Sequence, residues 1–478
     1  MKCTLIIEDE VNVKFVGLTP ETRRKLVKSV EYRVPGAQFS PAVRLGRWSG
    51  FDSFFNLSGR SYLNLLDKFL PIIDDDGYTV EIEDNRRPGV FEFSAIDKDS
   101  YSHVIWPEGH VRAGECVTLR EHQVDMVNAF LNDPQSINVC PTSGGKTIVL
   151  VILSEKVQKY GRSIVIVPSK DLVTQTEKDY INFGLDVGVM FGDRKDIGKT
   201  HTICTWQTLE AMNKRKDGSL ESFLEGVVCV ICDECHLGKA NIIKSLLSGP
   251  CSNTPIRWGL TGTLPSEAHD KMTLLSTIGP VCNTIKATEL QDMGYMANLH
   301  VHIKQLVDIG PAFPDYAGEY KWLTTSTQRL TQIASMLPPI TSTGNTLILV
   351  NNIATGNALC SLIPGAIFLN GSVKSVDRLK EYKTVQSTSN VTLICTFGIA
   401  STGLDLPHLD NLILLEAGKA FTRVIQSIGR VLRITNDKVF ANVYDICSTY
   451  KYSKKHLTQR KAYYKEAGYP FSIAKVNY

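Results

Sequence analysis

A lysine and a threonine follow two consecutive glycines in the run Val139-Cys140-Pro141-Thr142-Ser143-Gly144-Gly145-Lys146-Thr147. In a loop of small residues, backbone N–H groups can converge on phosphate oxygens, a lysine can reach the β- and γ-phosphates, and a threonine hydroxyl can hold Mg²⁺. We therefore interpret the run as a phosphate-binding loop that opens a helix. A strand-to-helix turn without a ligand is the alternative, and Cys140 replaces the usual first glycine. The predicted phosphate-binding residues are Thr142, Ser143, Gly144, Gly145, Lys146 and Thr147.

Two adjacent acids follow the apolar run 227–232, in the sequence Asp233-Glu234-Cys235-His236. Parallel α/β sheets bind their ligands at the carboxyl ends of the strands. An acid at that edge can hold Mg²⁺, and a second acid can activate a water molecule. We predict these two roles for Asp233 and Glu234. A charged turn is the alternative, and the phosphate-binding loop upstream disfavours it.

Three further residues could contact a nucleotide. Gln123 lies in the helical pattern 119–131 and carries both donors and acceptors, so it could bind an adenine edge, although a lone glutamine on a helix is normally solvated. In the second half, Arg430 and Arg433 are three residues apart and would share one face of a helix. Paired arginines are usually surface charge. A domain without its own phosphate loop could, however, supply them as arginine fingers.

Apolar, strand-like runs alternate with helical stretches along most of the chain. These runs are 163–167, 201–204, 227–232, 345–350, 391–396 and 411–415. Such alternation predicts parallel sheets wrapped by helices. We expect an α/β protein with two domains of this kind, 113–285 and 286–478, after a small α/β domain, 1–112. The stretch 316–337 should be helical or linking, and 451–478 should form a basic, aromatic tail.

The composition is that of a globular protein, with 43% apolar and 21% charged residues and no apolar run that approaches a membrane span. The first ten residues have too short an apolar core for a signal peptide. Twelve cysteines lack the regularity of a disulfide framework, so we expect the reducing cytoplasm. Cys229, Cys232 and Cys235 have the spacing of part of an iron–sulfur motif. In a buried strand, however, Cys229 and Cys232 would face opposite ways.

Basic residues are concentrated in two regions, although the net charge of +3 is too small to indicate nucleic acid by itself. One region is 451–478, and the other is 21–60, where eight Lys/Arg stand against three Asp/Glu. Within 43–51, glycines would let the backbone approach a partner, arginines could contact phosphates, and a tryptophan offers a stacking face. A hairpin with a core tryptophan is the alternative. The predicted DNA contacts here are Arg44, Arg47 and Trp48.

Over residues 113–450, a set of motifs together resembles the superfamily 2 helicases in order and spacing. The motifs are Gln123, the loop with Lys146, Asp233-Glu234-Cys235-His236, Thr261-Gly262-Thr263, Thr402-Gly403-Leu404-Asp405 and the stretch 426–433. Within that superfamily, the chain is most similar to the phage UvsW type of DNA helicase. The matching segments are Arg44-Leu45-Gly46-Arg47-Trp48-Ser49-Gly50, the phosphate-binding loop and Thr205-Trp206-Gln207-Thr208. The resemblance implies two RecA-like domains with ATP between them, and an ATP-dependent DNA helicase that moves 3′ to 5′ on branched DNA in recombination, repair or replication.

The resemblance also implies roles for single residues. Lys146 and Thr147 would bind the triphosphate and Mg²⁺, and Asp233 would hold the ion. Glu234 would activate the attacking water, and His236 would couple hydrolysis to movement of the strand. The residues that would act on ATP from the second domain are Gly403, Asp405, Gln426, Arg430 and Arg433. The residues that would contact the nucleic-acid backbone are Pro168, Ser169, Thr205, Trp206, Gln207 and Thr396.

We accordingly expect ATP and Mg²⁺ as cofactors and DNA, branched or single-stranded, as the partner of a monomer that binds no membrane. A phage origin would place the protein in the cytoplasm of the host. An RNA or RNA–DNA hybrid helicase and a double-strand translocase without unwinding remain alternatives. A DNA-binding protein with an inactive ATPase is disfavoured because the residues that ATP hydrolysis would need are all present. They are Lys146, Asp233, Glu234, Arg430 and Arg433.

Overall fold

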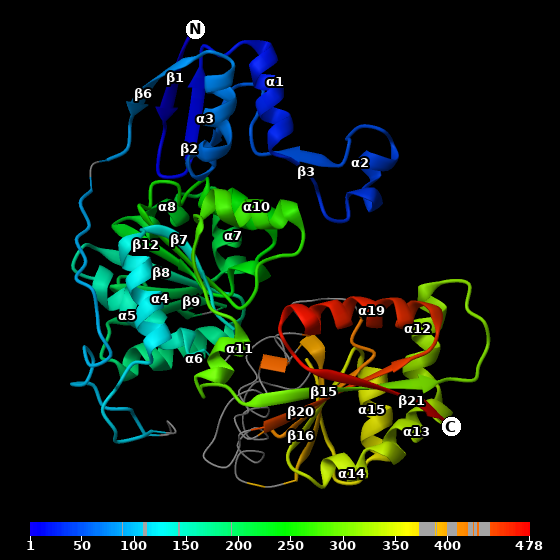
Figure 1. Ribbon diagram of the computed structural model, residues 1–478. Coiled ribbons are helices and arrows are strands. Elements are labelled where there is room, and N and C mark those ends of the chain that lie inside the picture. The colour runs from blue at the N-terminus through cyan, green and yellow to red at the C-terminus, as the bar shows by residue number, and fades with distance from the viewer. Residues whose placement is uncertain are drawn as a thin grey trace. The chain divides into compact units, whose positions relative to one another are not determined.

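The computed structural model describes residues 1–87, 89–108, 112–141, 144–192, 194–371, 388, 390–398, 409–418, 424, 428–429 and 440–478. The chain divides into two compact units, with the main break after Thr284 (Figure 1). No helix within the described residues has both the length and the apolar character of a membrane span.

The first unit begins with a four-stranded sheet that packs against two helices (Figure 1). Its strand order is β5-β2-β1-β6, in which β1 and β6 are parallel and the other pairs are antiparallel. Residues of β1 alternate between the core and the outer face because only one face of the sheet is packed. The elements are β1 (Lys2–Ile7), β2 (Asn12–Val16), α1 (Pro20–Ser29), β5 (Arg60–Tyr62), α3 (Leu66–Asp75) and β6 (Thr79–Asp84).

An eight-stranded sheet follows in the same unit, with the order β10-β9-β11-β8-β12-β13-β7-β14. All its neighbouring strands are parallel except β9 and β10. The predicted runs in this half form β8, β11 and β12, and they are continuous apolar sequences because helices cover both faces. The strands are β7 (Gln135–Val139), β8 (Arg162–Val167), β9 (Val187–Phe191), β10 (Arg194–Lys195), β11 (His201–Thr205), β12 (Val227–Cys232), β13 (Ile256–Thr261) and β14 (Val281–Thr284).

Two groups of helices flank this sheet (Figure 1). One group contains α4 (Glu121–Asn132), α5 (Lys146–Val157) and α6 (Lys170–Asn182). The other contains α7 (Trp206–Arg215), α8 (Ser219–Leu224), α9 (Ala240–Leu247) and α10 (Ala268–Thr277). The strand-to-helix turns therefore lie at the carboxyl edge of the sheet, where ligands bind in folds of this kind.

The second unit has a seven-stranded parallel sheet with the order β17-β18-β16-β19-β20-β15-β21. The three apolar runs predicted in this half form β16, β18 and β19. The strands are β15 (Asn298–Val307), β16 (Thr346–Val350), β17 (Ile367–Leu369), β18 (Thr392–Thr396), β19 (Asn411–Leu415), β20 (Phe440–Ser448) and β21 (Phe471–Asn477). The stretch 316–337 forms two helices, α12 (Tyr316–Thr325) and α13 (Thr327–Met336). The predicted α/β fold with two parallel-sheet domains is confirmed.

The basic, aromatic C-terminal segment is not a tail. It forms α19 (Lys451–Glu466), and β21 then pairs with β15 and extends the sheet. The Arg460 guanidinium donates two hydrogen bonds of 2.8 Å to the buried Asp445 carboxylate, and the Tyr464 hydroxyl donates to the same group at 2.8 Å. The many lysines of this segment predict a basic tail, although one face of α19 is buried.

The N-terminal sheet domain contacts α9 and α10 through Asp52, on β4 (Phe51–Ser53). Oδ2 of Asp52 accepts a hydrogen bond from Lys244 Nζ at 2.8 Å and lies 3.3 Å from His269 Nε2. Hydrogen bonds to Asp270 and Asp52 raise the pKa of His269 to about 9. The hydrogen bonds from His269 and Lys244 lower the pKa of Asp52 to about 2. The two folded parts of the first unit are thus joined by a charged contact as well as by the connecting chain.

Candidate active site and nucleic-acid interface

Helix α5 begins at Lys146, directly after a glycine with left-handed backbone geometry. Gly145 has φ 79° and ψ 35°, a conformation that glycine adopts without steric cost. A Cβ atom at Gly145 would lie 2.2 Å from Nε2 of Gln123. The Gln123 side chain is buried: its Oε1 accepts from the Arg120 N–H at 2.9 Å, and its Nε2 lies 3.5 Å from the Gly145 carbonyl oxygen. The structure therefore places Gln123 against the phosphate-binding loop.

Lys146 and Glu234 form an ion pair, with Nζ 2.6 Å from Oε1. Nζ of Lys146 also lies 3.3 Å from the Cys140 carbonyl oxygen, and Oε2 of Glu234 accepts from the Gly262 N–H at 3.2 Å. Glu234 has φ 46°, a left-handed conformation that a non-glycine residue adopts at a cost of about 1–3 kcal/mol. The start of α5 and the ends of β12 and β13 therefore meet at one point of the sheet edge.

Burial and neighbouring charges set the protonation of this group. Burial, and after it the Glu234 carboxylate, raise the pKa of Asp233 to about 7. Burial alone would lower the pKa of Lys146, but the Glu234 and Asp233 carboxylates outweigh it and raise that pKa. Burial alone would raise the pKa of Glu234, but the Lys146 cation outweighs the effect of burial and lowers that pKa. The pair is therefore charged, and Asp233 is the carboxyl group that an added cation would stabilise.

Asp233 and Thr147 are the predicted ligands of a Mg²⁺ ion. Oδ1 of Asp233 accepts from the Glu234 N–H at 3.0 Å, and burial and the Glu234 carboxylate raise the pKa of Asp233, so a bound cation would stabilise its charged form. Thr147 is the second residue of α5, next to Lys146. No group of three or more His, Cys, Asp or Glu in the described part of the chain could enclose a metal. Mg²⁺ commonly uses few protein ligands and completes its coordination with phosphate and water.

His236 connects the ends of two neighbouring strands. Its Nδ1 lies 2.5 Å from the Thr261 hydroxyl, which also donates to the Thr263 carbonyl oxygen at 2.6 Å. Nδ1 of His236 is 3.5 Å from Oε2 of Glu234. Burial lowers the pKa of His236 to about 4, so the imidazole is neutral at neutral pH. Nδ1 of the neutral ring can change its hydrogen-bond partner from Thr261 to Glu234 without a change in the charge of the ring.

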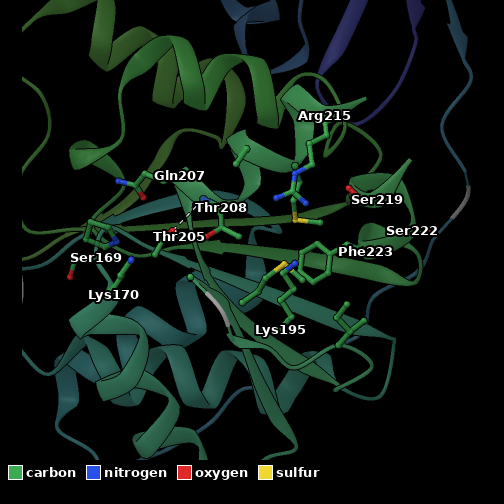
Figure 2. A pocket seen from close by; sticks show the side chains of 16 residues that line it. Ser169, Lys170, Lys195, Thr205, Gln207, Thr208, Arg215, Ser219, Ser222 and Phe223 are labelled. Carbon is green, nitrogen blue, oxygen red and sulfur yellow. Dashed lines mark hydrogen bonds between the residues drawn. The ribbon is translucent and has the colours of Figure 1, made fainter. Parts of the chain in front are cut away.

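Four of the predicted nucleic-acid contacts line one cavity of about 810 Å³ in the first unit (Figure 2). They are Pro168, Ser169, Thr205 and Gln207. Ser169 is the N-cap of α6 and accepts from the Leu172 N–H, and Thr205 is the N-cap of α7 and accepts from the Thr208 N–H. Helix N-termini attract phosphate through their free N–H groups and their dipole. The cavity thus has two adjoining anion-favouring edges.

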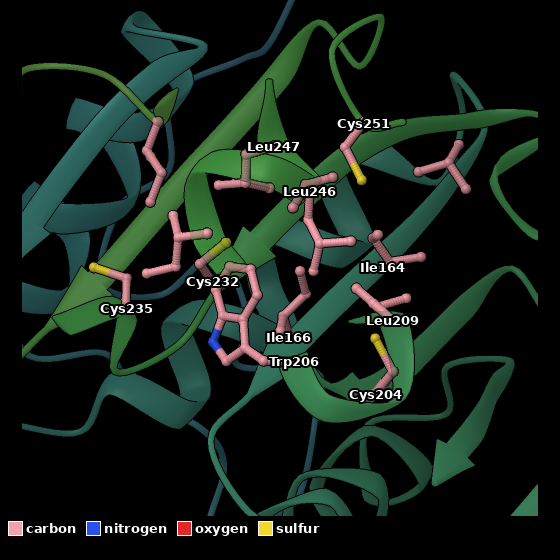
Figure 3. Packing of buried hydrophobic residues seen from close by; sticks show 14 of the residues in the cluster. Ile164, Ile166, Cys204, Trp206, Leu209, Cys232, Cys235, Leu246, Leu247 and Cys251 are labelled. Carbon is pink, nitrogen blue, oxygen red and sulfur yellow. The ribbon is translucent and has the colours of Figure 1, made fainter. Parts of the chain in front are cut away.

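The Trp206 side chain differs from this set. It is 3% exposed and packs in the core beside Cys232, Cys235 and Leu246 (Figure 3). The indole is an apolar group at the first position of α7. Because it is buried in the core, it cannot contact a nucleic-acid strand bound at the surface. We therefore exclude the Trp206 side chain from the proposed interface.

The cysteines of the CxxCxxC spacing are buried thiols. Burial raises the pKa of Cys229 and Cys235 well above the ordinary thiol value, which disfavours the thiolates that bind metals. Cys232 and Cys235 belong to the core cluster of Figure 3, together with Cys204 and Cys251.

The Arg44-to-Gly50 segment lies between the two strands of an antiparallel ribbon, β3 (Glu31–Arg33) and β4. Arg44 ends the short helix α2 (Pro41–Arg44), and both Arg44 and Arg47 are exposed. Trp48 is half-buried, and its Nε1 donates to the Phe51 carbonyl oxygen at 2.8 Å. The tryptophan is therefore held at the base of the segment and is only partly available for stacking.

Several predicted site residues lie outside the described residues. They are Thr142, Ser143, Gly403, Asp405, Gln426, Arg430 and Arg433. Gly144 precedes Gly145 in the phosphate-binding loop, and its N–H donates to the Pro141 carbonyl oxygen at 3.1 Å. Thr396 is the last residue of β18 in the second unit, at the carboxyl end of a parallel strand.

Sequence reasoning missed the cations that line the cavity and the contact between Asp52, Lys244 and His269. The cavity cations are Lys170, Lys195 and Arg215. Lys170 follows Ser169 directly, so its place beside a predicted contact was a usable signal. Lys195 and Arg215 come from elements that only the folded sheet brings together.

Two families match most of the two parallel-sheet domains. Residues 116–266 match the family described as "Type III restriction enzyme, res subunit", and residues 328–435 match "Helicase conserved C-terminal domain". The chain is 22% identical over 458 residues to "ATP-dependent DNA helicase uvsW" of Enterobacteria phage T4, a match that covers 90% of this chain and 88% of that protein. The chain is a superfamily 2 helicase.

Other proteins resemble parts of this helicase. It is 24% identical to "General transcription and DNA repair factor IIH helicase/translocase subunit XPB" of Danio rerio, over 78% of this chain and 50% of that protein. A fragment of the HsdR subunit of a type I restriction enzyme from Vibrio vulnificus YJ016 has a similar fold, with a TM-score of 0.57 and 17% identity over 86% of this chain and 74% of that one. The helicase is accordingly an ATP-hydrolysing enzyme with tandem RecA-like domains.

Proposed function

We propose that this helicase uses ATP hydrolysis to move 3′ to 5′ along DNA and remodels branched DNA such as forks, D-loops or Holliday junctions. The observation that carries the proposal is the cavity edge, where the N-termini of α6 and α7 and a group of cations face one surface. Contacts of this kind bind a phosphate backbone without regard to base sequence, as a motor that travels along DNA requires.

In the proposed hydrolysis step, Lys146 moves from Glu234 to the β- and γ-phosphates of ATP. Glu234 is then free to accept a proton from the attacking water, while the Gly262 N–H holds its other oxygen at 3.2 Å. Asp233 and Thr147 would hold Mg²⁺, which neutralises phosphate charge when bound. His236 passes the change at Glu234 to Thr261 through the 2.5 Å contact between Nδ1 and Oγ1. Arg430 and Arg433 would stabilise the charge that develops on the γ-phosphate.

The N-terminal domain is proposed to select branched DNA. Arg44 and Arg47 are exposed and have no ion pair among the described residues, so both could contact phosphates. Phe39 and Leu45 flank them and are 68% and 66% exposed, which makes them available to base faces at a junction. The Asp52 contact would hold this surface in a constant position relative to the first RecA-like domain.

A full-length Arg44→Ser/Arg47→Ser variant tests the branched-DNA proposal. It should keep single-strand-stimulated ATPase activity and lose preference for Holliday junctions over linear duplex, with a shallower dependence of junction affinity on salt. Lys2→Ser/Lys25→Ser is the matched control, because it removes the same charge from the same domain at lysines already paired with Glu81 and Asp76. An unchanged junction preference in the arginine variant would refute the selection role.

The restriction-enzyme matches favour one alternative, a double-strand translocase that does not unwind. Strand displacement and triplex displacement distinguish the two activities on the same DNA. Triplex displacement without strand separation on forks, junctions or RNA–DNA hybrids would establish the alternative.

A further inference from the structure

The cavity of Figure 2 contains an apolar chamber as well as a phosphate-binding edge. Its volume of about 810 Å³ exceeds what a backbone phosphate needs and is within the range of sites that enclose small aromatic ligands. Met190 and Phe223 are almost fully buried in its wall. The apolar lining residues are Met190, Ile197, Ala211, Met212 and Phe223.

The cations of the cavity are not committed to internal ion pairs. Lys170, Lys195 and Arg215 have no carboxylate within 4 Å among the described residues, and none of the lining residues is an acid. Three nearby cations outside the cavity are paired with carboxylates. Those pairs are Arg194 with Glu177 at 2.7 Å, Lys199 with Asp186 at 2.7 Å and Lys214 with Glu210 at 2.5 Å. Lys170 and Lys195 therefore place positive charge without an ion pair at the chamber, and Arg215 adds a guanidinium that interacts electrostatically with the Asp217 carboxylate.

A polar group at the chamber wall also lacks a well-aligned hydrogen bond. Ser219 Oγ is buried near the Asp217 carboxylate and makes no well-aligned hydrogen bond in the described part of the chain. Figure 2 shows Ser219 beside Arg215, at one side of the cavity. A buried hydroxyl without a well-aligned partner costs free energy that a ligand with a polar edge can recover.

We infer that the chamber receives one unstacked base of the DNA strand whose backbone is held at Ser169 and Thr205. The inference rests on the proposed function, since it requires a strand at that edge. The base would lie among the Met190 and Met212 thioethers and the Phe223 ring. Its polar edge would contact Ser219. The cations that would contact the flanking phosphates are Lys170, Lys195 and Arg215. A free anion would leave the apolar wall unused, and an apolar side chain would leave the cations unused.

The inference assigns the chamber a role in substrate choice. A base in duplex DNA must leave its stack and its partner before it can enter, which costs a few kcal/mol, whereas a base in a single strand pays much less. The chamber therefore favours single-stranded regions without reading their sequence.

An abasic scan of a short single strand tests the inference on the full-length protein. Partial duplexes with a single-stranded thymidylate tail, which carries one abasic site at each successive position from the junction, are bound in turn to the wild-type protein, so that the junction fixes the register of the strand. One position should weaken binding about tenfold while the remaining positions have little effect, because a single stacked base is lost. A uniform scan would overturn the inference.

Two variants and a control localise the effect. Ala211→Leu/Ser222→Leu narrows the chamber from α7 and α8 at exposed positions, and it should abolish the abasic penalty. Lys195→Ser should keep the penalty but reduce the slope of log affinity against log salt by about one unit. Lys199→Ser removes the same charge outside the chamber and should change neither quantity.

The outcomes separate this inference from the proposed function. If single strands stimulate the ATPase and the scan is uniform, the chamber inference fails and the motor proposal stands. If single strands neither bind nor stimulate the wild-type protein, the motor proposal itself fails. An abasic penalty that persists in a folded Ala211→Leu/Ser222→Leu protein would place the sensitive base elsewhere and overturn the assignment.

Discussion

Lys146 Nζ lies 2.6 Å from Glu234 Oε1, so the lysine of the phosphate-binding loop directly neutralises the glutamate that follows β12. Each side chain suppresses the other's proposed task while the pair is intact. Movement of the lysine to a phosphate oxygen would free the glutamate to act as a base. In the proposed hydrolysis step, the pair would thus make activation of water conditional on engagement of the triphosphate.

Lys146→Ala should reduce ATP hydrolysis by about 100-fold or more and leave single-strand binding intact, because the charge that stabilises the phosphates is lost. Glu234→Gln should reduce hydrolysis equally but still bind ATP. Steady-state ATPase assays and nucleotide titration measure both effects. Lys156→Ala, in the last turn of the same helix, is the control. Near wild-type turnover by Lys146→Ala would show that this loop does not bind the reacting phosphates.

Thr261→Val should separate hydrolysis from unwinding. It removes the hydroxyl that contacts His236 Nδ1 at 2.5 Å and keeps the shape of the side chain. The loss should lower the free energy of unfolding by about 1–3 kcal/mol, because a buried polar group loses its partner. More ATP should be consumed for each base pair separated, and Thr261→Ser should restore the wild-type ratio. An equal fall in both rates would argue against a coupling role.

The stability gained from His269 should decrease as pH rises through about 9. Its pKa in the folded protein is about 9, above the unfolded value of 6.5, so its contribution is complete below 6.5 and is lost as the ring deprotonates near 9. Asp52→Asn should cost about 1 kcal/mol at neutral pH, since Asp52 is partly exposed and its contacts are screened. The difference in unfolding free energy from wild type should shrink between pH 7 and about 9.5. Asp76→Asn, at a pair within the N-terminal domain, should show no such decrease.

Arg329→Met should destabilise the second unit by about 3–5 kcal/mol, because two buried carboxylates lose their cation. The guanidinium is fully buried and bonds to Asp308 at 3.0 Å and to Glu416 at 2.7 Å. Chemical denaturation of the variant measures the cost. The Arg329→Met/Glu416→Gln double variant should recover part of it, since one uncompensated charge is then removed. A double variant less stable than the single one would contradict this explanation.

Arg433→Ala should lower kcat far more than it weakens ATP affinity. This prediction rests on the sequence alone, since Arg433 lies outside the described residues. A guanidinium that stabilises charge mainly in the transition state contributes little to ground-state binding. Arg433→Lys should be a poor replacement, because an ammonium cannot bind two phosphate oxygens with a planar fork. Wild-type kcat in Arg433→Ala would exclude the finger role.

The chemistry-bearing segments were predictable from the sequence because their physical requirements are local. Gly145 must adopt a left-handed conformation before α5, and the apolar runs that form β8, β11 and β12 must be buried on both faces. These constraints act on consecutive residues, so residue type and spacing express them directly. The α/β fold followed from them, whereas the ATP-hydrolysing class followed from the resemblance of the motif set to superfamily 2 helicases.

Tertiary structure alone decided which side chains of those segments reach the surface and which distant residues join them. Trp206 and Gln207 are adjacent, yet the indole enters the core and the amide lines the cavity, because one face of α7 packs against the sheet. Asp52 meets His269, and Lys195 comes to line one cavity with Arg215, only where the packed elements bring them together. Such pairings depend on packing between residues far apart in the chain, and no local pattern encodes them.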